Sequence, residues 1–136
     1  MDAYNYGHED PSVQKICTSS FSLRLALWQD WSKTSYFYSM MSLPDFKQSL
    51  AGSSPPAEVS PYLASMWHDA KGDWNKAHSI IQNIEDKKAA WVHAYLHRKE
   101  GDIGNADYWY RRAGKTRPSS SLDTEWENIV KELLEK

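Results

Sequence analysis

The chain has 136 residues, of which 40% are hydrophobic, and its 16 basic and 18 acidic side chains give a net charge of -2. This length is typical of one domain with a real core, and the charge balance lacks the basic excess that nucleic-acid binding requires. Its apolar stretches are far shorter than the ~20 residues that cross a bilayer, and the N-terminus has no basic start or apolar signal core. We therefore expect a cytoplasmic protein without nucleic-acid or membrane partners.

Residues 1–40 differ in pattern from the rest of the sequence. The stretch "FSLRLALW" alternates apolar and polar side chains with the period of a strand, yet no second strand is nearby to pair with it. Regular helical patterns begin at Met41, so we expect residues 1–40 to be a dispensable N-terminal extension and residues 41–136 to be the folded domain. The alternative is an N-terminal helix over residues 23–31 that packs on this domain.

Helix boundaries are marked along residues 41–118. Ser42 and Pro44 are typical of the start of a short helix, which "AGSSPP" ends. Further N-cap candidates predict helices over about 61–71, 74–84, 87–100 and 103–114, and these candidates are Ser60, Asp73, Asp86 and Asp102. Gly72 and Gly101 are typical of residues that close a helix.

A last helix is predicted from an apolar stripe near the C-terminus. Its members recur at helical spacing and are Trp126, Ile129, Val130, Leu133 and Leu134. Thr124 and Glu127 have the spacing of a capping box, which predicts that the helix begins near Thr124. We expect this helix to close the fold by burying its stripe.

Two segments repeat one pattern at an offset of 29 residues. When "MWHDAKGDWNKAHSIIQNI" is placed over "YLHRKEGDIGNADYWYRRA", His68 matches His97 and Gly72 matches Gly101. Each segment predicts a helical hairpin that is too small to bury its own apolar face, so the two are expected to stack. The second unit, "AAWVHAYLHRKEGDIGNADYWYRRAGKTRP", resembles a tetratricopeptide repeat in its early Trp, its Gly-Asp turn and the spacing that leads to Pro118.

These patterns together predict an all-α fold of two stacked antiparallel helical hairpins, a short tetratricopeptide-like solenoid, plus a C-terminal capping helix. Residues 41–136 are also similar to small bacterial proteins that carry "WHDAKGDW" and "WVHAYLHRKEGD", a likeness that implies no particular activity.

The motif "HAYLH" places His93 and His97 four residues apart on a predicted helix. Zinc proteases use this spacing, but Ala94 stands where those enzymes need a glutamate as general base. At about 100° per residue, Trp91 and Tyr95 lie on the apolar side of the helix and both histidines lie opposite. Replacing both histidines with alanine is therefore expected to cost little stability.

The tetratricopeptide resemblance adds a third histidine. In that family the first helices of the hairpins line the concave surface. The resemblance therefore implies that His68, His93 and His97 share one face, with Asp69 and Arg98 near its edge.

The aromatic run "YWY" at residues 108–110 spans too wide an arc of a helix to be fully buried. Tyr110 shares the apolar stripe, so Tyr108 is expected to point outward beside Arg111 and Arg112, which are residue types that anchor interfaces. The alternative is that Tyr108 packs against the C-terminal helix or the N-terminal extension.

No phosphate-binding loop, nucleophile elbow or recognised pairing of cysteine with histidine is present in the sequence. We therefore expect a non-enzymatic module without cofactor that binds a peptide or protein partner through the histidine face. The alternative is a metal-binding protein or metal-dependent hydrolase in which His68, His93 and His97 hold zinc.

Overall fold

The computed structural model describes residues 41–135, and the expectations for residues 1–40 lie outside this part. Helices are the only regular secondary structure of the described residues, which confirms the all-α class. They are α2 (Leu43–Ser49), α3 (Pro61–Ala70), α4 (Trp74–Ile81), α5 (Lys87–Glu100), α6 (Ile103–Ala113) and α7 (Leu122–Leu134). No helix in this part of the chain combines the length and apolar character that crossing a bilayer requires.

Local capping explains where most of these helices begin and end. The predicted N-caps each accept a hydrogen bond from a backbone N–H in the first turn, and they are Ser42, Ser60, Asp73, Asp86 and Asp102. Gly72 and Gly101 have φ angles of 83° and 96°, a conformation that favours glycine. The capping prediction for α7 is wrong by three residues, because Ser121 caps the helix by accepting from the Thr124 N–H at 3.2 Å.

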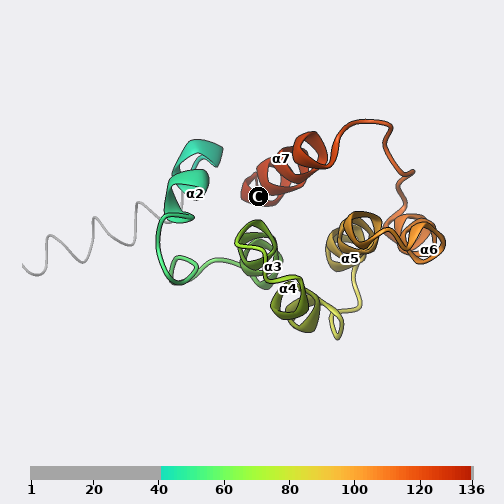
Figure 1. The fold of residues 1–136 in the computed structure, drawn as a ribbon, viewed down its shortest axis with the longest axis horizontal. Coiled ribbons are helices and arrows are strands. Elements are labelled where there is room, and N and C mark those ends of the chain that lie inside the picture. Colours follow the sequence, from blue (N-terminus) through green and yellow to red (C-terminus); the bar gives the residue numbers. More distant parts are fainter. Residues whose placement is uncertain (1–40, 136) are drawn as a thin grey trace, which may run out of the picture. The chain divides into compact units, whose positions relative to one another are not determined.

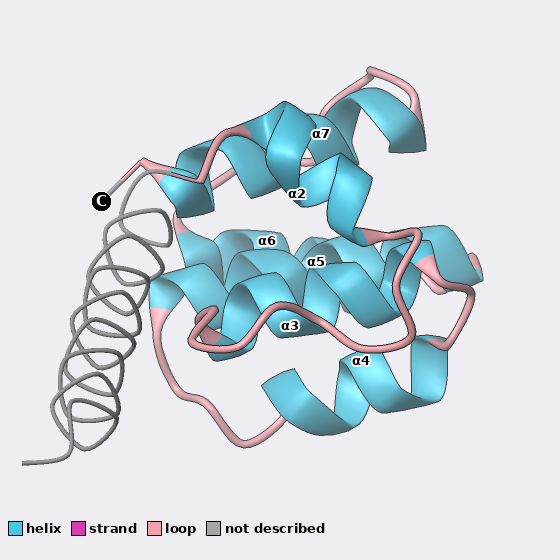
Figure 2. Cartoon of the chain, turned by 90° about the vertical axis from the view of Figure 1, so that its left-hand side faces the viewer, coloured by secondary structure: helices cyan, strands magenta, loops and turns pink. Residues whose placement is uncertain are grey.

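The helices lie in three layers (Figures 1 and 2). The hairpin helices α3, α5 and α6 form the middle layer, α2 and α7 lie on one side of it, and α4 lies on the other. Helix α5 is central, because it packs against α3, α4, α6 and α7. Helix α7 thus covers the face that α3 and α5 share, while the finer likeness to tetratricopeptide stacking remains a prediction.

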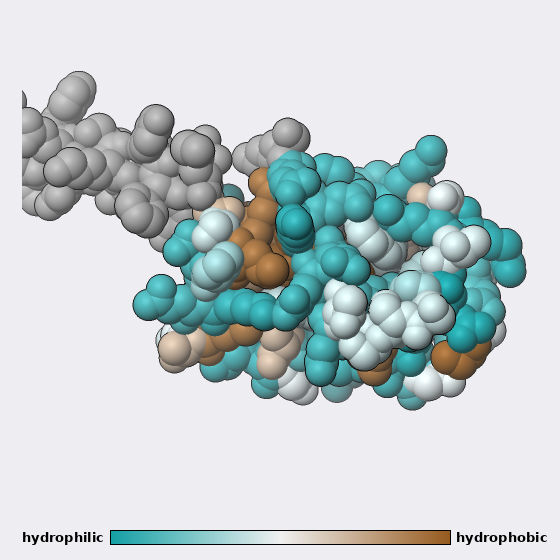
Figure 3. Space-filling view, turned by 90° about the horizontal axis from the view of Figure 1, so that it is seen from above, coloured by the Kyte–Doolittle hydropathy of each residue, from teal (hydrophilic) through white to brown (hydrophobic). Residues whose placement is uncertain are grey.

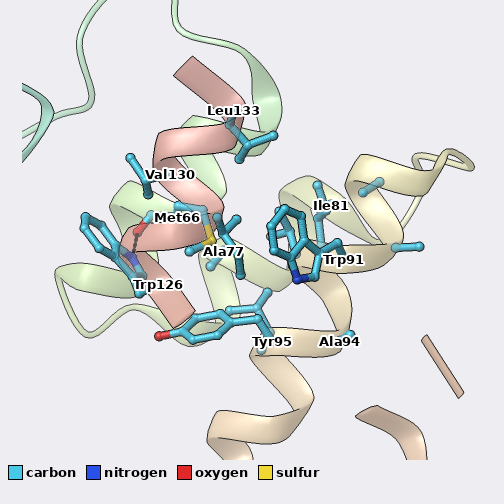
Figure 4. Packing of buried hydrophobic residues seen from close by; sticks show 14 of the residues in the cluster. Met66, Ala77, Ile81, Trp91, Ala94, Tyr95, Trp126, Val130 and Leu133 are labelled. Carbon is cyan, nitrogen blue, oxygen red and sulfur yellow. Dashed lines mark hydrogen bonds between the residues drawn. The ribbon is translucent and has the colours of Figure 1, made fainter. Parts of the chain in front are cut away.

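The apolar core joins both hairpins to α7 (Figure 4). Trp126 of α7 donates from its indole Nε1 to the carbonyl oxygen of Met66 in α3 at 3.1 Å, and its ring lies 6.0 Å from that of Phe46. The predicted burial of the α7 stripe is confirmed for Trp126, Ile129, Val130 and Leu133. The C-terminal helix is therefore an integral part of the core.

The face shown in Figure 3 is mainly hydrophilic and carries its apolar side chains in separate patches. Among the described residues, the large hydrophobic side chains that are exposed are Ile103 and Tyr108, both on α6.

Candidate metal centre

Helix α5 is buried around its whole circumference, which corrects the expectation of an exposed histidine face. Every residue from 89 to 97 is buried, and His93 and His97 are only 6% and 7% exposed. The two histidines do lie away from the side that α7 covers, but α4 and α6 pack against their side. The expectation that His93 and His97 can both be replaced with alanine at little cost in stability therefore loses its physical basis.

A third histidine meets this pair, and it is His78 of α4. Nε2 of His78 lies 2.9 Å from Nε2 of His93, a hydrogen-bonding distance at which one ring donates and the other accepts. One potential ligand atom from each of His78, His93 and His97 lies within 4.8 Å of the other two. We call these three residues the histidine cluster.

The predicted third member, His68, does not belong to the histidine cluster. Its half-buried ring lies edge-on to its neighbour Trp67, with ring centroids 5.2 Å apart. The predicted set of His68, His93 and His97 is therefore corrected in one member.

Two tryptophans enclose the histidine cluster. The ring of Trp74 stacks on His78 with centroids 4.8 Å apart, and Trp109 of α6 stacks on His93 at 4.0 Å. Trp74 is held in place because its Nε1 donates to the carbonyl oxygen of Leu96 at 2.9 Å. The imidazoles thus lie in a mostly aromatic junction between α4, α5 and α6, in which His93 and His97 are buried and His78 is partly exposed.

This environment favours the neutral imidazole. Burial, reinforced by the neighbouring His78 and His97, lowers the pKa of His93 from 6.5 to about 4. Burial also lowers the pKa of His78. Both side chains are therefore neutral at pH 7, which is the form in which histidine binds metals.

His97 has two further polar neighbours. Its Nδ1 lies 3.1 Å from Oε2 of Glu100, one turn further along α5. Its Nε2 lies 3.3 Å from the side-chain nitrogen of Asn105, in the first turn of α6. Two oxygen-bearing side chains thus adjoin His97.

The structure places Asp69 and Arg98 in internal networks instead of at the histidine cluster. Asp69 is 2% exposed and accepts from the Lys99 ammonium at 3.0 Å and from the Tyr95 hydroxyl at 3.3 Å. Arg98 forms an ion pair with the buried Glu125 of α7. Both side chains therefore hold helices of this fold together.

Glu125 has a second partner, because it also accepts a hydrogen bond from the Tyr110 hydroxyl. Burial and this acceptor raise the pKa of Tyr110. A buried carboxylate satisfied by a guanidinium and a phenol links α7 to both helices of the second hairpin.

The outward orientation predicted for Tyr108 is confirmed, because its side chain is 45% exposed while Tyr110 is 1% exposed. The Arg112 guanidinium lies 5.1 Å from the Trp109 ring and donates to the Tyr108 hydroxyl at 3.2 Å. Arg111 is exposed beside them. These residues form the outer side of α6, and Trp109 separates them from His93.

The sequence reasoning missed His78, although one signal pointed to it. His78 follows Trp74 by four residues and precedes Ile81 by three, so it lies beside the apolar stripe of its helix. That spacing predicts that the ring of His78 lies near a helix interface. It does not predict which residue of α5 the ring contacts.

Comparisons of this chain with protein families, with curated proteins and with solved structures gave no match.

Proposed function

We propose that residues 41–135 form a non-enzymatic helical module that binds a divalent transition-metal ion through His78, His93 and His97. The observation that carries this proposal is the convergence of three ring nitrogens, each within 4.8 Å of the others. Tetrahedral zinc with nitrogen ligands at about 2.0–2.1 Å places those nitrogens about 3.3 Å apart. Zinc binding therefore requires side-chain rotations that bring the ring nitrogens from separations of up to 4.8 Å to that spacing.

The chemistry of the donors favours late first-row ions. Imidazole nitrogen suits zinc, copper and nickel, whereas magnesium and calcium prefer oxygen ligands. No cysteine lies among the described residues, so thiolate does not enter this donor set. Zinc at a three-histidine site has a fourth position, which water or a nearby amide or carboxylate oxygen fills.

A structural ion is better supported than a hydrolytic one. Ala94 stands where the zinc proteases with this histidine spacing have their general base. Three cavities between the described residues, of about 580, 500 and 190 Å³, are lined by residues outside the histidine cluster. An ion at the cluster would therefore link α4 of the first hairpin to α5 of the second.

Zinc titration of protein purified without a histidine tag tests this proposal. We expect one zinc per chain and a concentration-dependent rise in unfolding temperature, because binding to the folded state at 100 times the dissociation constant adds about 2.7 kcal/mol of stability. His78→Gln should lose binding, whereas His68→Ala, the matched control outside the cluster, should keep it. Equal zinc binding by both variants would refute the site, with circular dichroism used to confirm that each is folded.

A second candidate function, binding of a peptide or protein partner, is favoured by the outer side of α6. Tyr108 and Arg112 are exposed there and support each other through a hydrogen bond and a cation–π contact. The histidine face first expected to carry this function is buried, so Tyr108, Arg111 and Arg112 are the predicted anchors.

Photo-crosslinking in cells tests this second function. A crosslinker placed at residue 108 should give an adduct of defined mass that Arg112→Ala abolishes, and a crosslinker at the exposed Glu132 of α7 serves as the control. Identical adducts from both positions would contradict it.

A further inference from the structure

Glu100 is the one carboxylate that contacts the histidine cluster among the hydrogen bonds of the described residues. Its Oε2 lies 3.1 Å from Nδ1 of His97, and its side chain is 47% exposed while that of His97 is 9% exposed. The carboxylate therefore reaches from solvent to the outer nitrogen of a buried ring.

The contact with Glu100 favours one tautomer of His97. An ionised carboxylate only accepts hydrogen bonds, so Nδ1 must carry the proton that it donates to Glu100. The Asn105 side-chain nitrogen lies 3.3 Å from Nε2 and 3.5 Å from Nδ1, so it contacts the ring without distinguishing the two nitrogens. The proton held at Nδ1 leaves Nε2 of His97 unprotonated, which is the state that a metal ligand requires.

The position of Glu100 opposes the local preference of its helix. Glu100 is the last residue of α5, directly before the C-cap Gly101. Negative charge is unfavourable at a helix C-terminus, where the helix dipole and the free carbonyl groups favour a cation. At the repeat-equivalent position of the first hairpin, 29 residues earlier, Lys71 is the C-cap of α3, as that rule favours. A carboxylate at this position therefore calls for a compensating contact, and its hydrogen bond with His97, three residues earlier in the same helix, supplies one.

We infer that Glu100 is a positioning residue that holds the His97 ring in the Nδ1-protonated tautomer, with Nε2 directed toward a metal ion bound by the histidine cluster. This inference rests on the proposed metal binding. A carboxylate behind a ligating histidine fixes the orientation of the ring and raises its basicity, and its loss typically weakens metal binding about 10–100-fold. Because Glu100 is half exposed, its removal should affect affinity much more than folding.

Zinc affinity and the His97 tautomer, measured together, test the inference. In the metal-free protein, nitrogen-15 chemical shifts of the imidazole should show Nδ1 protonated in the wild type and a mixture of tautomers in Glu100→Ala. Zinc should bind Glu100→Ala at least tenfold more weakly than the wild type. Glu100→Gln retains an oxygen acceptor without the charge, so it should keep the tautomer and recover part of the affinity.

The matched control is Glu132→Ala, which removes an exposed carboxylate of α7 that lies 3.5 Å from Lys115. This substitution should leave the zinc affinity and the His97 tautomer unchanged. An unchanged His97 tautomer in Glu100→Ala, or zinc affinity within twofold of the wild type, would overturn the inference. If the wild type binds no zinc, the proposed function fails, and the tautomer measurement in the metal-free protein still decides whether Glu100 positions His97.

Discussion

The two hairpins share their local sequence pattern but differ in how much of their first helix is covered. Helices α3 and α5 both end before a glycine with positive φ, and an aspartate caps the helix that follows. Yet Ala64 and His68 in the middle of α3 are only partly buried, whereas α5 is buried continuously from residue 89 to residue 97. The repeat therefore sets where the helices begin and end, and their position in the stack sets their environment.

His68 and His97 show this difference most directly, because the repeat aligns them with each other. Within residues 41–135 His68 is not part of the histidine cluster, while His97 meets His78 across the junction with α4. Equivalent repeat positions thus carry different chemistry. The predictions below test whether neighbours in the stack, and not repeat position, account for it.

The largest effect is expected from removing α7, which covers the first helices of both hairpins. A chain that ends at Ser121 loses four buried apolar side chains, each worth about 1.5–3 kcal/mol, against a total stability of about 5–15 kcal/mol for a typical domain. It should therefore lose its cooperative thermal transition in calorimetry. A chain that ends at Leu134 is the control and should unfold cooperatively. A cooperative transition in the shorter chain would show that the hairpins are stable without their shared cover.

The second effect is the pH dependence of the metal-free protein, which should come from His93 in the second hairpin and, in the same direction, from His78 in α4. His93 has a pKa of about 4 when folded and 6.5 as the reference value for the unfolded chain. Between these values the unfolded state binds more protons, so stability is fully present above pH 6.5 and falls as pH is lowered to 4. The difference between these two pKa values of His93 corresponds to about 3 kcal/mol of folding stability.

Urea unfolding at pH 7 and pH 4.5 in the presence of a chelator measures this loss. His93→Phe keeps an aromatic ring against Trp109 but cannot titrate, so its stability should fall less over this range than that of the wild type. His68→Ala should retain the full loss. Identical pH profiles for His93→Phe and the wild type would locate the titration elsewhere.

The smallest effect compares the repeat-equivalent histidines themselves. His97→Ala removes a buried ring from the junction of α4, α5 and α6 and leaves a cavity there, so it should cost about 1–3 kcal/mol in urea unfolding. His68→Ala should stay within about 1 kcal/mol, because its ring is only half-buried. Equal losses would mean that repeat position matters more than the neighbours in the stack.

The sequence by itself determined the helices and most of their boundaries. Capping side chains such as Asp86, and glycines with positive φ such as Gly101, act within a few residues of the chain, so their effect is readable locally. The apolar stripe of α7 and the outward orientation of Tyr108 were predictable for the same reason, since helical periodicity assigns each residue to a face. The misplaced start of α7 arose because Thr124 and Ser121 both have hydroxyl side chains that suit a cap.

Only the tertiary structure decided the composition of the histidine cluster. Periodicity separates the two sides of α5 but does not say whether a neighbouring helix covers the second side, and here α4 and α6 cover it. His78 and His93 are 15 residues apart and meet only because the two hairpins dock with these side chains at the junction. That docking depends on the fit of buried side chains across four helices, which no local pattern encodes.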